Sequence, residues 1–310
     1  MNIPRHRSPR TTYGYLAMAS AGTFLLAACG SGGSTSAAPA ESSEKLDVDP
    51  AAAKLLPADI KKAGVLRVAT DATYPPFEYF DTDNKTIIGA DADFAQALGD
   101  VLGVKVTLTN VSFDGLIPTL DSGKADLAAA GMADKEERRK LITFVDYARN
   151  DPAFLLKPGD TSIKTFADLC GKNVAVQSAT SMADNLVTQS KLCTDKGEKP
   201  VAIKEYKGQD QAILAVQSGR AVAAVSTGGS GAYLVDQAEG QLEIVIPPDE
   251  LSEDVPLGLA VPKADTELVR AVHAAMARLI DDGTYARIMK KWGLTKCCSY
   301  TEKTVDNAKF

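Results

Sequence analysis

Short apolar runs alternate with amphipathic stretches along most of the chain after Gly64. The short runs predict strands, and apolar positions at helical spacing predict helices. In the first part, strands are predicted at 65–69, 104–108 and 126–130, and helices at 91–102 and 114–121. The order restarts with strands at 173–177, 201–206 and 221–226, and helices at 182–190, 209–218 and 230–237. Two such βαβ series predict parallel sheets that are covered by helices.

The pattern changes after the second series, where Pro247 and Pro248 interrupt it. One more strand is predicted at 257–261, followed by helices at 265–281 and 284–292. This late strand is expected to complete the first sheet. The predicted fold class is therefore α/β with two lobes, each a mostly parallel sheet flanked by helices, and a cleft between them. Lobe 1 is expected to contain residues 55–152 and 255–310, and lobe 2 residues 153–254.

An internal similarity between residues 120–129 and 216–225 supports two lobes of like topology. In both segments a predicted helix ends at a Ser-Gly pair, Ser122-Gly123 and Ser218-Gly219, and a strand follows at once. Glycine at that place suits the left-handed residue that ends many helices. Ligands of open parallel sheets bind beyond the carboxyl ends of the strands. The loops that begin at Ala130-Gly131 and Ser226-Thr227 are therefore expected to line one cleft.

The first residues have the layout of an export signal. Three arginines lie within the first ten residues, and an apolar stretch follows over 15–28. We expect residues 1–28 to be a signal peptide. The stretch ends in Leu26-Ala27-Ala28-Cys29, which resembles the lipobox of bacterial lipoproteins and implies that Cys29 is lipidated. The alternative is an ordinary signal peptide in which this cysteine is incidental.

Residues 30–43 consist of small and polar residues and Pro, too few of them apolar to form a core. We expect 29–54 to be the lipidated cysteine and a flexible linker, with the folded part beginning near 55–60. Together with the signal, this predicts a protein outside the cytoplasm that is anchored to the cell membrane through Cys29.

Four further cysteines bear on the same compartment. Outside the cytoplasm a disulfide between Cys170 and Cys193 is expected, and two buried free thiols are the alternative. Cys297 and Cys298 are adjacent. The sequence leaves open whether they form a strained vicinal bridge, pair with another chain or stay reduced.

Composition excludes several functions. The chain has 310 residues and a formal net charge of −6, with no basic stripe beyond the first ten residues, which argues against a nucleic-acid partner. Its two histidines are His6, in the predicted signal, and His273, on the polar side of a predicted helix. No Ser-His-acid or Cys-His arrangement, metal-ligand spacing or phosphate-binding loop is present. We expect no metal and no cofactor, and an enzyme could use only carboxylates.

Binding chemistry is better represented. Residues 71–78 follow the first strand and combine Asp71, Tyr74 and two prolines. Thr180 and Ser181 open a helix, where free N–H groups favour an anion, although an ordinary N-cap explains Thr180 equally well. Arg138 lies in a charged run, which by itself is most often a solvated helical face.

Taken together, these motifs resemble the extracytoplasmic amino-acid-binding proteins of ABC importers, over about residues 60–294. The motifs that carry the resemblance are Leu66-Arg67-Val68-Ala69-Thr70-Asp71, Tyr74-Pro75-Pro76-Phe77-Glu78, Gly89 with Asp91, Asp93 and Phe94, Phe113 to Pro118, Gly131 to Arg138, Phe144 with Asp146, Gly171 to Gln177, and Asp282-Gly283-Thr284-Tyr285. The resemblance implies the two-lobed periplasmic-binding-protein fold. It also implies a monomer that binds a small zwitterionic, amino-acid-like ligand and serves membrane permease subunits.

The resemblance also implies roles for individual residues. Arg138 would hold the ligand's carboxylate through its planar fork, and Thr180 and Ser181 would complete that site from the other lobe. Tyr74 and Phe113 would enclose the ligand's side chain. The remaining roles are for Asp71 to face a cationic or amide end of the ligand, and for the backbone of Gly131, next to Ala130, to contact an ammonium group.

Two positions depart from the family pattern. Ala133 stands where Thr or Ser is usual, and Thr227 where an Asp usually pairs with the α-ammonium group. A buried ammonium needs a counter-charge. The hypothesis that follows is a ligand whose positive group is not a primary α-ammonium, or one whose ammonium is held by Asp71.

Two other classes of function compete with this interpretation. A few proteins of this fold are carboxylate-dependent dehydratases, and here Glu78 or Asp71 would be the acid. A sensor domain would need a transmembrane helix and a cytoplasmic module after lobe 2, and neither follows in this sequence.

Overall fold

The structure is a computed structural model that describes residues 45–248, 251 and 255–309. The predicted signal peptide and the lipidation of Cys29 lie outside these residues. Within the described ranges, no helix has the length and apolar character needed to cross a membrane.

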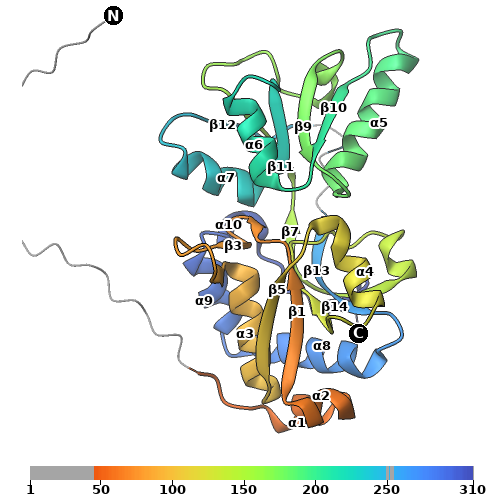
Figure 1. Ribbon diagram of the computed structural model, residues 1–310, viewed down its shortest axis with the longest axis vertical. Coiled ribbons are helices and arrows are strands. Elements are labelled where there is room, and N and C mark those ends of the chain that lie inside the picture. Colours follow the sequence, from red (N-terminus) through yellow and green to blue (C-terminus); the bar gives the residue numbers. More distant parts are fainter. Residues whose placement is uncertain (1–44, 249–250, 252–254, 310) are drawn as a thin grey trace, which may run out of the picture. The chain divides into compact units, whose positions relative to one another are not determined.

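One sheet combines strands from both ends of the described chain (Figure 1). In the described residues it has seven strands in the order β15-β14-β7-β13-β6-β1-β5. Their bounds are Val65–Thr70 for β1, Lys105–Asn110 for β5, Leu127–Ala128 for β6, Ile142–Asn150 for β7, Val255–Pro262 for β13, Thr304–Val305 for β14 and Ala308–Lys309 for β15. We call this sheet with its helices lobe 1. The late strand that was expected to complete it is β13, which pairs with β6 and β7.

A second sheet is formed by the middle of the chain, which we call lobe 2. Among the described residues its five strands have the order β10-β9-β11-β8-β12. Their bounds are Pro152–Leu156 for β8, Asn173–Gln177 for β9, Ala202–Tyr206 for β10, Ala223–Thr227 for β11 and Glu243–Val245 for β12. A small third sheet contains β2 (Thr73–Tyr74), β3 (Glu78–Phe80) and β4 (Ile87–Ile88).

The expectation of mostly parallel sheets is wrong. The strands of the predicted βαβ series are parallel, namely β1 with β5 and β6, and β9 with β10 and β11. All other pairings in the two large sheets are antiparallel. The antiparallel pairings involve β7, β8, β12, β13, β14 and β15, which lie outside the two predicted βαβ series.

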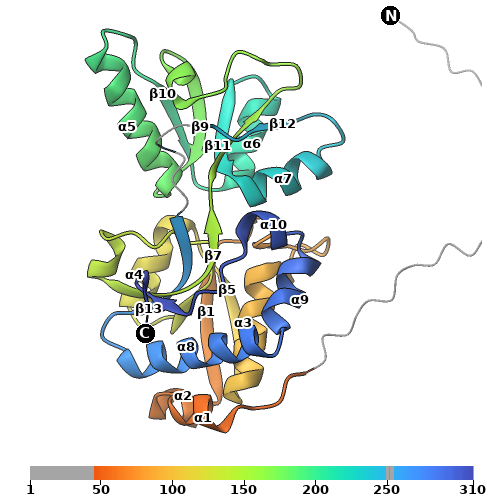
Figure 2. The ribbon, with the colours of Figure 1, turned by 180° about the vertical axis from the view of Figure 1, so that it is seen from behind.

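Helices cover both faces of the lobe 1 sheet. The larger core lies under α1 (Pro50–Lys54), α2 (Ala58–Ala63), α3 (Ala90–Leu102), α8 (Thr266–Asp281) and α9 (Thr284–Lys291). Figure 2 shows α8 and α9 from behind. The opposite face packs on η1 (Phe113–Gly115) and α4 (Leu116–Asp121). Alternate residues of β1 serve the two cores, with Leu66 and Val68 in one and Ala69 in the other, because side chains of a strand alternate between faces.

Lobe 2 is layered in the same way. One face of its sheet packs on η3 (Phe166–Leu169) and α5 (Ser181–Asp195), and the other on α6 (Gln209–Gln217) and α7 (Gly228–Gln237). The remaining elements are η2 (Arg138–Lys140) and α10 (Thr295–Cys298), which both belong to lobe 1.

The boundary expected between the linker (29–54) and the folded part lies too late in the sequence, because residues 50–54 already belong to the fold. Residues 50–54 form α1, with the Asp49 side chain accepting hydrogen bonds from the backbone N–H groups of Ala51 and Ala52. Ala52 is 2% exposed within the larger core of lobe 1. The small residues of this segment have high helix propensity, and docking on α3 and α8 orders them.

The internal similarity is confirmed in backbone conformation. Helix α4 is followed by Gly123 at φ +67°, and α6 by Gly219 at φ +74°, both in the left-handed region. Each glycine leads into a strand that pairs in parallel with a neighbour, β6 with β1 and β11 with β9. The two loops selected from the sequence therefore follow equivalent strands.

Both pairs of cysteines are bonded. The expected bridge joins Cys170 to Cys193, with the Cα atoms 5.7 Å apart. Cys297 and Cys298 are bonded to each other, which settles the choice that the sequence left open.

The bridge between Cys170 and Cys193 links the end of η3 to α5, and both elements pack on the lobe 2 core. Replacing both cysteines by serine should lower the free energy of unfolding by about 2–4 kcal/mol, because the bridge restricts the unfolded chain. Chemical denaturation followed by circular dichroism measures this change. An unfolding free energy equal to that of the wild type would show that the bridge does not stabilise the fold.

Candidate ligand-binding site

A cavity enclosing about 450 Å³, part of it open to solvent, lies between residues of lobe 1 and lobe 2. All ten residues that the sequence placed in a site line it. They are Asp71, Tyr74, Phe113, Ala130, Gly131, Ala133 and Arg138 from lobe 1, and Thr180, Ser181 and Thr227 from lobe 2. Six further residues complete the lining: Glu78, Gln177, Met182, Gln209, Ser226 and Leu257.

Strand ends explain why these residues meet. Asp71 follows β1, and Ala130 lies just beyond β6. In lobe 2, Gln177 ends β9 and Thr227 ends β11. These strands are parallel within each sheet, so their carboxyl ends lie at one edge, and the two edges share the cavity.

Arg138 is held at the junction of the lobes. Its Nη1 donates to the carbonyl oxygen of Ala133 in lobe 1 at 2.8 Å, and its Nη2 to that of Ala179 in lobe 2 at 2.9 Å. The guanidinium carbon lies 5.5 Å from the centre of the Phe113 ring. Burial lowers the pKa of this guanidinium. In the described part of the chain no carboxylate lies within ion-pair distance of it.

Arg139 has a different role from Arg138, and the charged run that contains both residues is not a plain solvated helical face. Arg139 binds the buried carboxylate of Asp134 with both arms of its fork, at 2.6 and 2.9 Å. Hydrogen bonding to Asp134 raises the pKa of Arg139. Arg139 therefore stabilises lobe 1, whereas Arg138 faces the cavity.

The first turn of α5 lies next to Arg138, which donates a hydrogen bond to the carbonyl oxygen of Ala179. Thr180 is the N-cap, and its Oγ1 accepts from the N–H of Ala183 at 3.2 Å and donates to the carbonyl oxygen of Gln177 at 2.8 Å. The N-cap interpretation is thus correct, and it does not exclude a place in the cavity lining. The positive end of a helix dipole and a guanidinium group together favour a carboxylate.

Aromatic rings line another side of the cavity. The Tyr74 hydroxyl hydrogen-bonds with Oγ1 of Thr227, across the lobes. Its ring stacks on Phe77 at 5.9 Å, and Phe77 is fully buried, as expected of a core residue. Phe113 contributes a second ring beneath Arg138.

Asp71 is a buried carboxylate whose contacts span both lobes. It accepts from the N–H of Phe113 at 3.1 Å, from Nε2 of Gln177 at 2.5 Å and from the Thr73 hydroxyl at 3.1 Å. Burial raises its pKa to about 6, although these hydrogen bonds oppose the shift. The group is ionised at neutral pH and close to titrating just below it.

A second carboxyl, that of Glu78, is 1% exposed and lines the cavity. Its Oε2 has no hydrogen-bond partner among the described residues. Burial, and then the charge of the adjacent Asp91, raise its pKa well above the ordinary value. Asp91 itself accepts from the Tyr147 hydroxyl at 2.6 Å and from the N–H of Gly131 at 2.8 Å. Glu78 is therefore a buried acid of the cavity lining, and it is held next to the Asp91 carboxyl.

The sequence missed six lining residues as ligand contacts. Ser226 begins one of the two selected loops but was not named as a contact, and Gln177 ends β9, so the strand-end rule could have found both. Glu78 was considered only as a catalytic acid. Met182, Gln209 and Leu257 carry no signal, because only tertiary packing brings them to the cavity.

In the described residues, no cluster of three or more His, Cys, Asp or Glu side chains could hold a metal ion. Two sheets contribute to one cavity, whose lining combines Arg138 and the first turn of α5 with two carboxyls, and this arrangement is typical of a two-lobed solute-binding protein. The chain belongs to the bacterial extracellular solute-binding proteins of family 3, whose family model matches residues 66–295.

Characterised relatives resemble the chain over most of its length. The arginine-binding protein ArgT of Corynebacterium glutamicum is 31% identical over 241 residues, which cover 77% of this chain and 78% of the relative. The L-cystine-binding protein TcyA of Bacillus subtilis is 30% identical over 243 residues, covering 76% of this chain and 83% of the relative. A solved ancestral arginine-binding protein bound to arginine has a TM-score of 0.67 at 36% identity, covering 74% of this chain and 98% of that one.

Proposed function

We propose that this protein is the substrate-binding component of an ABC importer and that it captures a cationic amino acid of the arginine type. The observation that carries the proposal is that two buried carboxyls, those of Asp71 and Glu78, line one cavity together with Arg138. Two carboxyls and one guanidinium, which forms no ion pair in the described part of the chain, complement a ligand that has two positive groups and one negative group.

In this proposal each charge of the ligand has a partner. Arg138 and the first turn of α5 hold the α-carboxylate. Asp71 supplies a counter-charge for one positive group of the ligand. Glu78, whose pKa is raised in the ligand-free protein, would supply the other by ionising when the cation binds, because a nearby positive charge lowers the pKa of a carboxyl. They replace the acid that is missing at Thr227, so a standard amino acid remains compatible with Ala133 and Thr227. The arginine-binding relatives support the same class of ligand.

The cellular setting belongs to the proposal as well. We propose that residues 55–152 with 255–310 and residues 153–254 act as two lobes that close on the ligand. The monomeric closed form would dock on membrane permease subunits. Lipidated Cys29 would keep the protein at the cell membrane, since its two acyl chains anchor stably.

The anchor is tested by replacing one residue. Cys29→Ala should release the protein into the medium while its affinity for ligand stays unchanged, because residue 29 precedes the matched family domain. Fractionation of cells and medium by immunoblot measures the distribution. A Cys29→Ala protein that stays with the membrane would contradict the proposed lipid anchor.

Acidification should have opposite effects on stability and on binding. Burial raises the pKa of Asp71 and Asp91 to about 6 and that of Asp146 to about 7, above the ordinary value of 3.8. Such groups favour the folded state when protonated, a contribution that is present below about pH 4 and lost as the pH rises through 6–7. The melting temperature of the ligand-free protein should therefore rise from pH 7.5 to 5.

Affinity for L-arginine should fall over the same range, because Asp71 and Glu78 must both be ionised in the complex and protons compete with the cation for them. Calorimetric titrations and thermal scans at matched pH values measure both effects. An affinity that is constant between pH 7.5 and 5 would contradict the role of the two carboxyls.

The proposal as a whole is tested by thermal shift with a panel of L-amino acids. A ligand present at 100 times its Kd stabilises the protein by about 2.7 kcal/mol. L-Arginine should raise the melting temperature most, and the acidic amino acids should have no effect. Mass spectrometry of small molecules released from the purified protein is an independent check. Stabilisation by acidic amino acids alone would refute the proposal.

One observation also favours a dehydratase as a second candidate. A carboxyl that is kept neutral by burial, as at Glu78, is suited to act as a general acid. Incubation with hydroxylated cyclic acids tests this alternative. Product formation that is abolished in Glu78→Gln would establish it, and its absence with these acids would leave the solute-binding function.

A further inference from the structure

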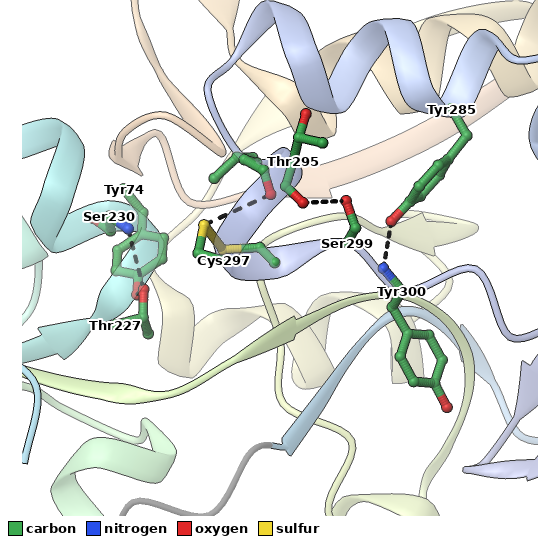
Figure 3. Close-up of a disulfide and its surroundings, with 10 residues drawn as sticks. Tyr74, Thr227, Ser230, Tyr285, Thr295, Cys297, Ser299 and Tyr300 are labelled. Atoms are coloured by element: carbon green, nitrogen blue, oxygen red, sulfur yellow. Dashed lines mark hydrogen bonds between the residues drawn. A yellow bond between two sulfur atoms is a disulfide. The ribbon is translucent and has the colours of Figure 1, made fainter. Parts of the chain in front are cut away.

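The bonded pair Cys297–Cys298 lies where lobe 1 meets lobe 2. It ends the short helix α10 of lobe 1 and faces the first turn of α7 in lobe 2 (Figure 3). A Cβ atom added to Gly229, the second residue of α7, would lie 2.6 Å from Sγ of Cys298 and 3.4 Å from Sγ of Cys297. It would also lie 3.1 Å from Leu294. The close approach of the two lobes at this point therefore depends on glycine and on the compact bonded sulfur pair.

The same end of α7 reaches the cavity. Its N-cap is Thr227, which lines the cavity and hydrogen-bonds with Tyr74. Further contacts with lobe 1 are the bond from Oγ of Ser230 to the carbonyl oxygen of Pro75 at 2.7 Å and the pair of hydroxyls of Tyr79 and Tyr233 at 3.1 Å. A displacement of α7 from the sulfur pair would thus loosen the lobe contact that borders the cavity.

The two cysteine residues differ in exposure. Cys297 is exposed, whereas Cys298 is 1% exposed. A thiolate of a small dithiol can attack Sγ of Cys297, which forms a mixed disulfide and breaks the bond between the two cysteines, with Cys298 leaving as a thiolate. The second thiol of the dithiol then displaces Cys297. The protein gains two electrons and two protons, and the dithiol becomes a cyclic disulfide.

We propose that Cys297–Cys298 is a thiol–disulfide site that controls closure of the lobes, and that its reduction weakens solute binding. Bonded sulfur atoms lie about 2 Å apart, whereas non-bonded heavy atoms need about 3.5–4.0 Å. The two thiols of the reduced form require more room than the bonded pair, and Cys298, which is 1% exposed beside Gly229, has little room to move away. Over-packing of this kind corresponds to a loss of affinity of roughly 5- to 100-fold.

The other disulfide serves as an internal control. Cys170 and Cys193 belong to the lobe 2 core, and Cys193 is fully buried. Their bond joins two elements of one lobe, so its state should affect stability but not closure. The proposal rests on the lobe closure proposed above, but not on which solute binds.

The experiment compares the oxidised protein with protein treated with dithiothreitol until mass spectrometry shows only the Cys297–Cys298 bond to be open. Affinity for L-arginine is measured by calorimetry, and the radius of gyration without ligand by small-angle X-ray scattering. Reduction should weaken binding by roughly 5- to 100-fold and increase the radius of gyration. Gly229→Ala should weaken binding similarly while its disulfide is intact, because the added methyl group occupies the same contact.

Two variants complete the design. The double variant Cys297→Ser, Cys298→Ser should bind as weakly as the reduced protein and should not respond to dithiothreitol. The double variant Cys170→Ser, Cys193→Ser should retain the full response. Equal affinities of the oxidised and reduced proteins overturn the proposal. If L-arginine binds neither form, the proposed ligand is wrong, and an unchanged radius of gyration then also overturns the redox control.

Discussion

Replacing Glu78 by glutamine is expected to weaken binding of L-arginine by about 30-fold to several thousand-fold. Removing one partner of a desolvated charge pair costs about 2–5 kcal/mol, which converts to that range of affinity. Glutamine keeps the size of the side chain and loses only the ability to ionise when the cation binds. Because Glu78 is 1% exposed and its Oε2 has no partner in the described chain, the effect should be specific to the ligand.

The matched control is Glu243→Gln, which changes an exposed glutamate on β12 and should leave affinity unchanged. The fold should survive the change at Glu78, since a buried carboxyl with a strongly raised pKa destabilises the native state when it ionises. Calorimetry of both variants with L-arginine measures the difference. A loss of less than threefold in Glu78→Gln would remove this carboxyl from the site.

Replacing Arg138 by alanine should lower the affinity for every amino-acid ligand, whatever its side chain, by about 30-fold to several thousand-fold. The guanidinium would bind the carboxylate that all these ligands share, and burial has already removed much of its hydration. Arg138→Lys should restore only part of the affinity, because an ammonium group lacks the planar fork.

The proper control for Arg138 is Lys140→Ala, an exposed cation two positions on. Arg139 cannot serve, because its fork binds the buried Asp134 and its loss would disturb lobe 1. Titration of each variant with two ligands of different side chains measures the effect. Equal losses in Arg138→Ala and Lys140→Ala would indicate a general electrostatic field in place of a specific site.

Much of the fold could be predicted because local patterns agree with tertiary packing. The strand predicted at 173–177 has the same bounds as β9, and the helix at 209–218 differs from α6 by one residue. The ten predicted lining residues meet at one cavity because parallel strands end at one edge, which is a topological rule that sequence order alone can apply.

Other features depended on tertiary contacts. Residues 142–148 of β7 are buried on both faces, so the strand lacks the alternation that reveals a half-exposed strand. The different roles of Arg138 and Arg139 follow from the turn η2, which directs one guanidinium to the cavity and the other to Asp134. The role of Glu78 arises from the proximity of Asp91, which a one-dimensional pattern does not contain.

The contact between Gly229 and the cysteine pair has the same origin. The sequence around Gly229 and that around Cys298 give no sign of a contact between them, and the two residues lie in different lobes of the described chain. Adjacent cysteines indicated only that several redox states had to be considered. The position of the pair beside α7 is what gives a change of redox state a consequence for the cavity.

The central claim is that the cavity selects a cationic amino acid through its two carboxyls. Calorimetric titration with L-arginine and with L-citrulline, which has nearly the same shape but a neutral ureido group, tests it most directly. L-Arginine should bind at least about 30-fold more tightly than L-citrulline. This ratio corresponds to the lower end of the free energy lost when one partner of a desolvated charge pair is removed. Equal affinities, or tighter binding of L-citrulline, would contradict the claim.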